Sequence, residues 1–167
     1  FLSNALIAFS FLCTAQSFSE NFDAYSEGDY IGVVSPEFTT WSGTVGGAED
    51  AMVNATEAAS GDHSIYFNSV SAAGGPQDVV LPFGDVYTTG DFSFEAKFFV
   101  QDNKGAYFNF QGVASLGTMF PLNCQMVNDE SMYISTQGGD VVLETTFPQE
   151  TWFTIRVDIN LNANHWQ

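Results

Sequence analysis

In residues 91–100, DFSFEAKFFV, apolar and polar side chains alternate from Asp91 to Phe98. The apolar positions are Phe92, Phe94, Ala96, Phe98 and Val100, and the positions between them include Ser93, Glu95 and Lys97. A period of two is typical of a β-strand that is buried on one face and solvated on the other. The turn QDNKG at 101–105 leads into a second alternating run, AYFNFQG at 106–112. The two runs together predict a β-hairpin.

Similar short runs recur along the chain, separated by Gly, Asn, Asp and Ser. They predict further strands at 17–22, 64–70, 78–83, 119–127, 132–136, 141–147 and 151–161. About nine or ten short strands at this spacing are typical of a sandwich or jelly roll. The predicted fold is therefore all-β, a two-sheet antiparallel β-sandwich. The helix-compatible stretch at 49–59 is short and interrupted by β-branched residues, so no helix is predicted there.

Acidic residues dominate the charge of the chain. Asp and Glu total 20, Lys and Arg total 3, and the formal net charge is −17. Such a field repels phosphate backbones and anionic lipid head groups. We therefore expect no nucleic-acid partner and no binding to a membrane surface.

The first fifteen residues, FLSNALIAFSFLCTA, are uncharged and apolar over the length of a signal-peptide core. They are too short to span a bilayer, so no membrane insertion is expected. Cys13 and Ala15 are small residues with the spacing that a signal peptidase reads, which predicts cleavage before Gln16. The run has neither a Met nor a basic start, so the signal is expected to be incomplete. We predict a signal peptide at 1–15 and a β-sandwich domain at 16–167, in a secreted or cell-surface protein.

The C-terminal residues 162–167, NANHWQ, read as a turn followed by the start of another strand. We expect the sandwich to be truncated there, without its last strands, and to belong to a longer polypeptide with other domains. A sandwich without its closing strands exposes backbone edges and apolar surface. After removal of the signal, Cys124 is the one remaining cysteine, which excludes an internal disulfide. Its apolar surroundings predict a buried, unreactive thiol.

An ordered set of segments resembles a known family. These segments are SENFDAYSEGDYIG, WSGTVGGAEDAMV, SGDHSIYFNS, DVVLPFG, FSFEAKFFV with GAYFNFQ, and TWFTIRVDINLNANHWQ. In this order they resemble the concanavalin A-like (laminin-G-like) jelly-roll modules of secreted flavobacterial proteins, over nearly all of residues 18–167. The resemblance implies a jelly-roll module within a long secreted or surface protein. Such proteins often carry a sorting domain for type IX secretion, so that export route is implied by the resemblance alone.

The same fold hosts glycoside hydrolases, which places an enzyme among the alternatives. Laminarinase-type glucanases carry their carboxylates on one strand as Glu-x-Asp-x-x-Glu, and this motif does not occur here. We therefore expect a non-catalytic module. A divergent glycoside hydrolase or lyase of the same fold, and a structural or adhesion spacer, remain the alternatives.

No cofactor is predicted, although a structural Ca²⁺ ion is one possibility. His63 and His165 are far apart in the chain and lack the spacing of metal ligands. The oxygen-rich loops NFDAYSEGD (21–29) and VNDES (127–131) could hold Ca²⁺, but neither has the twelve-residue calcium-loop motif. We assign no metal ligands.

One polar strand face is the candidate ligand site. Tyr107, Asn109 and Gln111 share one side of the run at 106–112. Aromatic rings stack on sugars and planar amides bond to sugar hydroxyls, so this face suits a carbohydrate or an extracellular matrix component. The candidate face also includes Glu95, Trp152 and Arg156 from neighbouring runs. The alternative is an ordinary solvated sheet face, with Trp152 packed over an edge.

Overall fold

The computed structural model describes residues 18–68 and 74–167. The predicted signal peptide at 1–15 lies outside the described residues. Within them the chain is all-β, as predicted, and its strands pair in antiparallel fashion. A single helical turn, α1 (Ile31–Val34), is the one α-helix of this part of the chain. No helix among the described residues is long and apolar enough to cross a membrane.

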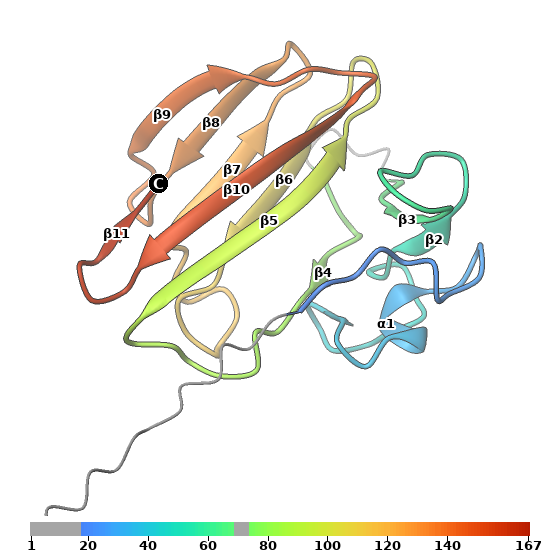
Figure 1. Cartoon of the computed structure of the whole chain (residues 1–167), viewed down its shortest axis with the longest axis horizontal. Coiled ribbons are helices and arrows are strands. Elements are labelled where there is room, and N and C mark those ends of the chain that lie inside the picture. The colour runs from blue at the N-terminus through green and yellow to red at the C-terminus, as the bar shows by residue number, and fades with distance from the viewer. Residues whose placement is uncertain (1–17, 69–73) are drawn as a thin grey trace, which may run out of the picture.

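Two sheets make up the larger part of the molecule (Figure 1). The four-stranded sheet has the order β6-β7-β8-β9, from β6 (Ala106–Phe110), β7 (Leu122–Met126), β8 (Ser131–Ser135) and β9 (Val141–Thr146). The three-stranded sheet has the order β11-β10-β5, from β5 (Asp91–Phe99), β10 (Trp152–Asn160) and β11 (His165–Trp166). Strands β5 and β10 pair over nine residues each.

The predicted hairpin between the first two runs is wrong. Strand β5 pairs with β10, and β6 pairs with β7, so the turn at 101–105 carries the chain from one sheet to the other. The apolar sides of the two strands face each other instead of lying side by side. The ring of Phe94 lies 5.9 Å from that of Phe108, and Phe98 stacks on Phe108 at 5.4 Å. Alternation identifies the buried face of a strand but does not determine which strand is its hydrogen-bonded partner.

The main core lies between these sheets. Its buried members are Val100, Phe110, Leu122, Cys124, Met126, Ile134, Phe147 and Val157. They come from alternate positions of the strands, together with the residues that follow β5 and β9. Cys124 is fully buried, and burial raises the pKa of its thiol to about 12. The predicted burial of this thiol is confirmed.

A smaller core lies in the N-terminal part of the chain. It consists of Ile31, Ala51 and Val53, packed among α1, β2 (Met52–Asn54) and β3 (Ser64–Tyr66). Two short strands, β1 (Thr39–Thr40) and β4 (Val79–Val80), pair beside it. As predicted, no helix forms at 49–59.

Several predicted strands are shorter than expected, and one is absent. The described part of 17–22 forms no strand, because the chain turns there. Phe22 has a φ of 68°, and its N–H donates to the Glu20 carboxylate at 2.7 Å. The run at 64–70 is a strand over Ser64–Tyr66, and the run at 78–83 is one over Val79–Val80.

A buried carboxylate organises the N-terminal part. Asp50 is 1% exposed and accepts the backbone N–H groups of Gly32, Gly46 and Ala51 at 3.0, 2.9 and 2.9 Å. One side chain therefore connects the turn of α1, the loop at 41–49 and the start of β2. Three charge-assisted hydrogen bonds compensate for the burial of this carboxylate.

One edge of β10 is open within the described part of the chain. Asp158 exchanges both backbone hydrogen bonds with Gln167, at 2.9 and 2.8 Å. Alternate residues of an antiparallel strand bond to the same neighbour, so Thr154 and Arg156 turn their backbone groups to this edge, where no described strand pairs with them. A cavity of about 240 Å³ lies between the sheets beside the edge. Its apolar lining includes Phe108, Leu122, Met132, Ile134, Leu143 and Trp166.

The burial of Cys124 predicts slow thiol chemistry. In a Cys13→Ser variant, we expect the remaining thiol to stay unreactive toward a disulfide reagent at pH 8, because both access and thiolate formation are suppressed. Addition of denaturant should restore a stoichiometric reaction, followed by absorbance. A fast reaction of the folded protein would contradict the burial of Cys124 in the core.

The hydrogen bonds of Asp50 predict a large effect of its removal. We expect Asp50→Ala to lower the free energy of unfolding by about 3 kcal/mol or more, because three backbone donors lose their acceptor. Asp50→Asn keeps one acceptor oxygen and should cost less. Glu57→Ala removes an exposed acid and should change stability by less than about 0.5 kcal/mol. Urea unfolding measures all three, and equal effects at positions 50 and 57 would refute the assignment.

Candidate functional site

The six candidate residues fall on two separate surfaces. Tyr107 and Asn109 lie on β6 and Gln111 directly follows it, all on the outer side of the four-stranded sheet. Glu95, Trp152 and Arg156 lie on β5 and β10, on the outer side of the three-stranded sheet. The inner sides of the two sheets pack together, so their outer sides point apart. The expectation of a single face is therefore wrong, because β5 and β6 belong to different sheets.

Strand register extends the Tyr107 surface across the whole four-stranded sheet. Tyr107 is opposite Gln125 on β7, Gln125 is opposite Tyr133 on β8, and Tyr133 is opposite Glu144 on β9. Opposed residues of neighbouring strands point to the same side of a sheet. We call these four residues, Tyr107, Gln125, Tyr133 and Glu144, the cross-strand row. Asn109, Asn123 and Ser135 form a second row beside it.

Tyr107 is the most exposed aromatic side chain of the row, with 56% of its surface accessible. Its hydroxyl donates to Oδ1 of Asn123 at 2.6 Å, which fixes the ring over the sheet. Partial burial, together with the nearby charge of Asp78, raises the pKa of Tyr107. The phenol therefore stays neutral at physiological pH.

Hydrogen bonds orient the side-chain amides of Asn109 and Gln111, which lie beside Tyr107 on the outer side of the four-stranded sheet. Nε2 of Gln111 donates to Oδ1 of Asn109, and Oε1 of Gln111 accepts the N–H of Gly117 at 2.9 Å. Both amides are thus oriented before any ligand arrives. A preformed orientation lowers the entropy that a bound ligand must offset.

The other three members of the row have unused hydrogen-bonding groups. Among the described residues, the side chains of Gln125, Tyr133 and Glu144 have no hydrogen-bond partner in the protein. Gln125 and Glu144 are exposed, and Tyr133 is half-buried. The row therefore combines an aromatic platform with an amide, a hydroxyl and a carboxylate that are open to solvent.

Sequence reasoning missed Gln125, Tyr133 and Glu144. The alternation of 119–127 and 132–136 placed Gln125 and Tyr133 opposite to the apolar positions, which was the available signal. Their alignment with Tyr107 depends on register, including a β-bulge where the partner of β8 changes between Ile134 and Ser135. No local pattern in the sequence specifies that bulge.

The Arg156 surface is a network of paired charges. Nε and Nη2 of Arg156 donate to the Asp158 carboxylate at 2.8 and 3.0 Å, and the hydroxyl of Ser93 donates to it at 2.6 Å. These bonds lower the pKa of Asp158 and raise that of Arg156. Nη1 of Arg156 lies 4.0 Å from Glu95. Solvent screens such exposed pairs strongly, so they add little to stability, and their main effect is to orient the side chains of Arg156 and Asp158.

An open hollow of about 480 Å³ lies over this network. Its polar lining comes from Asp91, Ser93, Arg156, Asp158, Asn160, His165 and Gln167. Most of these groups bond to one another, since Nδ2 of Asn160 also donates to Asp91 at 2.8 Å. A ligand would have to break these bonds, whereas the cross-strand row offers groups without partners.

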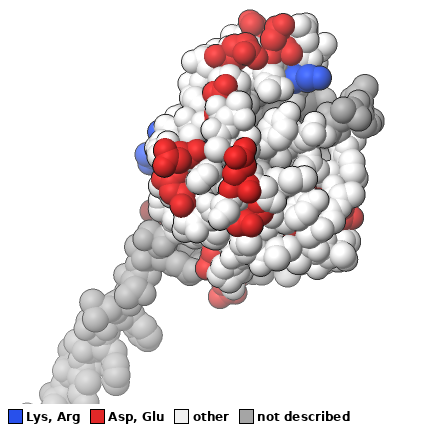
Figure 2. Space-filling view, turned by 90° about the vertical axis from the view of Figure 1, so that its right-hand side faces the viewer, with Lys and Arg blue, Asp and Glu red and all other residues white. Residues whose placement is uncertain are grey.

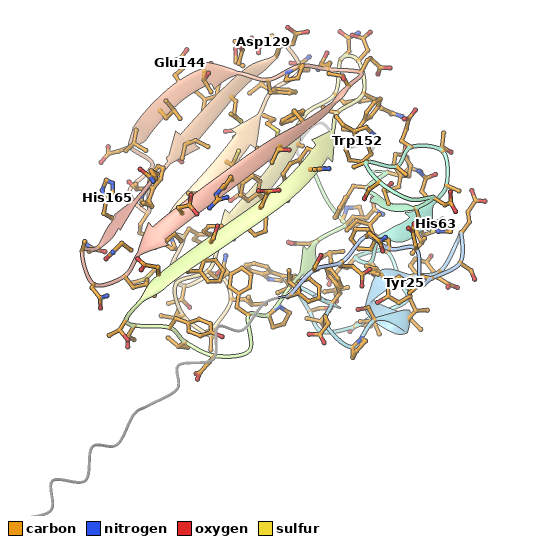
Figure 3. The ribbon with its side chains drawn as sticks, in the orientation of Figure 1. Tyr25, His63, Asp129, Glu144, Trp152 and His165 are labelled. Carbon is orange, nitrogen blue, oxygen red and sulfur yellow. The ribbon has the colours of Figure 1, made fainter. Side chains whose placement is uncertain are left out.

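Trp152 belongs to neither set of polar groups. Its ring is half-buried and lies 5.6 Å from that of Phe99, its partner on β5. Figure 3 shows it at one end of β10, well separated from Glu144 and His165. This geometry fits the alternative role of packing over the sheet.

The oxygen-rich loops use their carboxylates within the protein. Asp23 accepts the backbone N–H groups of Asp62 and His63 at 2.7 and 3.0 Å and an amide N–H of Asn21 at 2.7 Å. Asp129 accepts the N–H of Ser131 at 3.0 Å, which lowers its pKa. Within residues 18–68 and 74–167, no three His, Cys, Asp or Glu side chains converge as metal ligands.

The Arg156 network predicts a titration shift. Arg156→Gln should raise the pKa of Asp158, because the charged donors that stabilise its carboxylate are lost. The pairing is complete above the ordinary pKa of an aspartate and is lost as pH falls through the lowered value. Carboxyl NMR titration measures the shift. Lys97→Gln, on the same face, should leave it unchanged, and an unchanged Asp158 in Arg156→Gln would refute the pairing.

Comparisons with known proteins add no assignment to this geometry. No protein-family model, no curated protein and no solved structure matches the chain. Its function must therefore be argued from the residues of the two surfaces.

Proposed function

We propose that the chain is a non-catalytic, extracellular β-sandwich module of the concanavalin A-like jelly-roll type, which binds a carbohydrate or matrix polysaccharide. The module would belong to a larger secreted or surface protein. The observation that carries the proposal is the cross-strand row, where Tyr107 and Tyr133 alternate with Gln125 and Glu144. The apolar, uncharged run at 1–15 supports export.

The chemistry of the row matches what sugars require. Aromatic rings contact the C–H faces of a pyranose, and amides or carboxylates bond to pairs of hydroxyl groups. Four neighbouring strands cover three interstrand spacings, about 14 Å in total. A row of that length can contact several sugar units, so an oligosaccharide chain lying across the strands is the natural ligand.

The charge network on the other surface is less suited to catalysis. A glycosidase needs one carboxyl with a raised pKa as a general acid. Asp158 has a lowered pKa and is paired with Arg156, and Glu95 lies beside the same guanidinium. The carboxylates of Asp158 and Glu95 would have to leave the Arg156 guanidinium before either could act as the general acid of a hydrolase or lyase. This surface therefore gives no support to the enzyme alternative.

Substitution of the row gives a direct test. We expect a glycan-array screen of the protein, run with and without Ca²⁺, to detect binding that Tyr107→Ala weakens by about tenfold or more, because loss of a stacking aromatic removes a central contact. Gln125→Ala should weaken it also. Lys97→Ala, on the opposite outer face, is the matched control and should bind normally.

Two results would contradict this assignment. Binding that is lost in Arg156→Ala and kept in Tyr107→Ala would move the site to the hollow on the three-stranded sheet. A folded protein that binds no glycan under either condition would favour the structural or adhesion spacer.

A further inference from the structure

We infer that the ligand of the cross-strand row is an uncharged polysaccharide, and that acidic polysaccharides bearing carboxylate or sulfate groups are excluded. This inference rests on the proposed sugar-binding role of the row. It adds the chemical class of the ligand, which follows from where the few basic residues of the chain lie.

The protein has three basic side chains of Lys and Arg, and the structure describes all of them. Lys97 and Arg156 are on the outer side of the three-stranded sheet, facing away from the row. Lys104 lies in the turn before β6. Asp102 is in the same turn and Glu150 lies against it, since the N–H of Asp102 donates to Oε1 of Glu150 at 2.6 Å. No strand of the four-stranded sheet carries a Lys or Arg.

An acidic group ends the row instead. Glu144 ends it on β9, and its carboxylate makes no ion pair or hydrogen bond among the described residues. Burial raises the pKa of the Tyr107 phenol, and the charge of Asp78 adds a smaller contribution. Figure 2 shows the same imbalance on another side of the molecule, where acidic clusters outweigh small basic areas.

Acidic sugars are recognised by Arg and Lys, because a guanidinium or ammonium offsets the desolvation of the bound anion. The row has neither. A uronate or sulfate placed on it would meet Glu144 at close range and the field of a chain with net charge −17 at longer range. Hydroxyl groups carry no such penalty and match the amide, phenol and carboxylate that the row presents.

The test compares glycans that differ in charge and share a backbone. The pairs are methyl-esterified and de-esterified homogalacturonan, mannan and mannuronan, and glucan and glucuronan. Binding of the protein to each is measured at about 20 mM and about 300 mM NaCl, where the screening length falls from roughly 20 Å to below 8 Å. We expect at least one neutral member to bind, at least about tenfold more tightly than its acidic partner at low salt.

Two variants separate the local charge from the overall charge. Glu144→Gln should lower the ratio of the affinity for the neutral glycan to the affinity for its acidic partner, because it removes the carboxylate nearest to the ligand. Glu95→Gln makes the same change in net charge on the opposite outer face and should leave that ratio unchanged. Higher salt should narrow the ratio in the unsubstituted protein, since screening weakens the repulsion.

The possible failures are distinguishable. If an acidic member binds as tightly as its neutral partner or more so, and Tyr107→Ala weakens that binding, the inference is overturned while the sugar-binding function stands. If no member of any pair binds, the proposed function fails and this inference fails with it. Equal effects of Glu144→Gln and Glu95→Gln would show that net charge, and not the row, sets the preference.

Discussion

The contact between the aromatic faces of β5 and β6 determines the arrangement of the larger part of the molecule. Phe94 and Phe98 meet Phe108 and Phe110 across the space between the sheets, at ring separations of 5.3–5.9 Å. Rings of this size have strong geometric preferences and bury large apolar areas. Once they face each other, the polar positions of both strands must point outward in opposite directions. The separation of the two polar surfaces is thus a direct result of core packing.

How much the sequence could predict depends on whether a feature is local. The inward and outward sides of 91–100 and 106–112 follow from alternation, and the structure confirms them. Strand partners do not follow from it, because two strands with buried Phe residues can pair edge to edge or pack face to face. The hairpin prediction failed on that choice. The position of Glu144 beside Tyr133 was equally hidden, since it depends on the bulge in β8 and β9.

The N-terminal part shows a different limit of sequence reasoning. Its strands are too short to show alternation, and the buried Asp50 carboxylate connects the segments around them. No local pattern in the sequence reveals that burial. That carboxylate fixes the loop at 41–49 through Gly46, and the same loop begins with Trp41. A Cβ added to Gly117 would meet the Trp41 ring at 3.0 Å, and the Gly117 N–H in turn donates to Gln111. The N-terminal part of the chain therefore reaches the amides beside Tyr107 through the Trp41 ring and Gly117.

The scarcity of basic residues also governs how the protein meets a protease of trypsin-like specificity. Lys97 and Arg156 lie within β5 and β10, where nine paired residues hold each strand to the other and restrict its movement into the cleft of a protease. Cleavage at either site requires prior opening of the sheet. Lys104, in the connecting turn, is the one basic site of the chain that lies outside a strand. A cut there would leave every strand pair intact, so the two fragments would stay together as a nicked, folded protein.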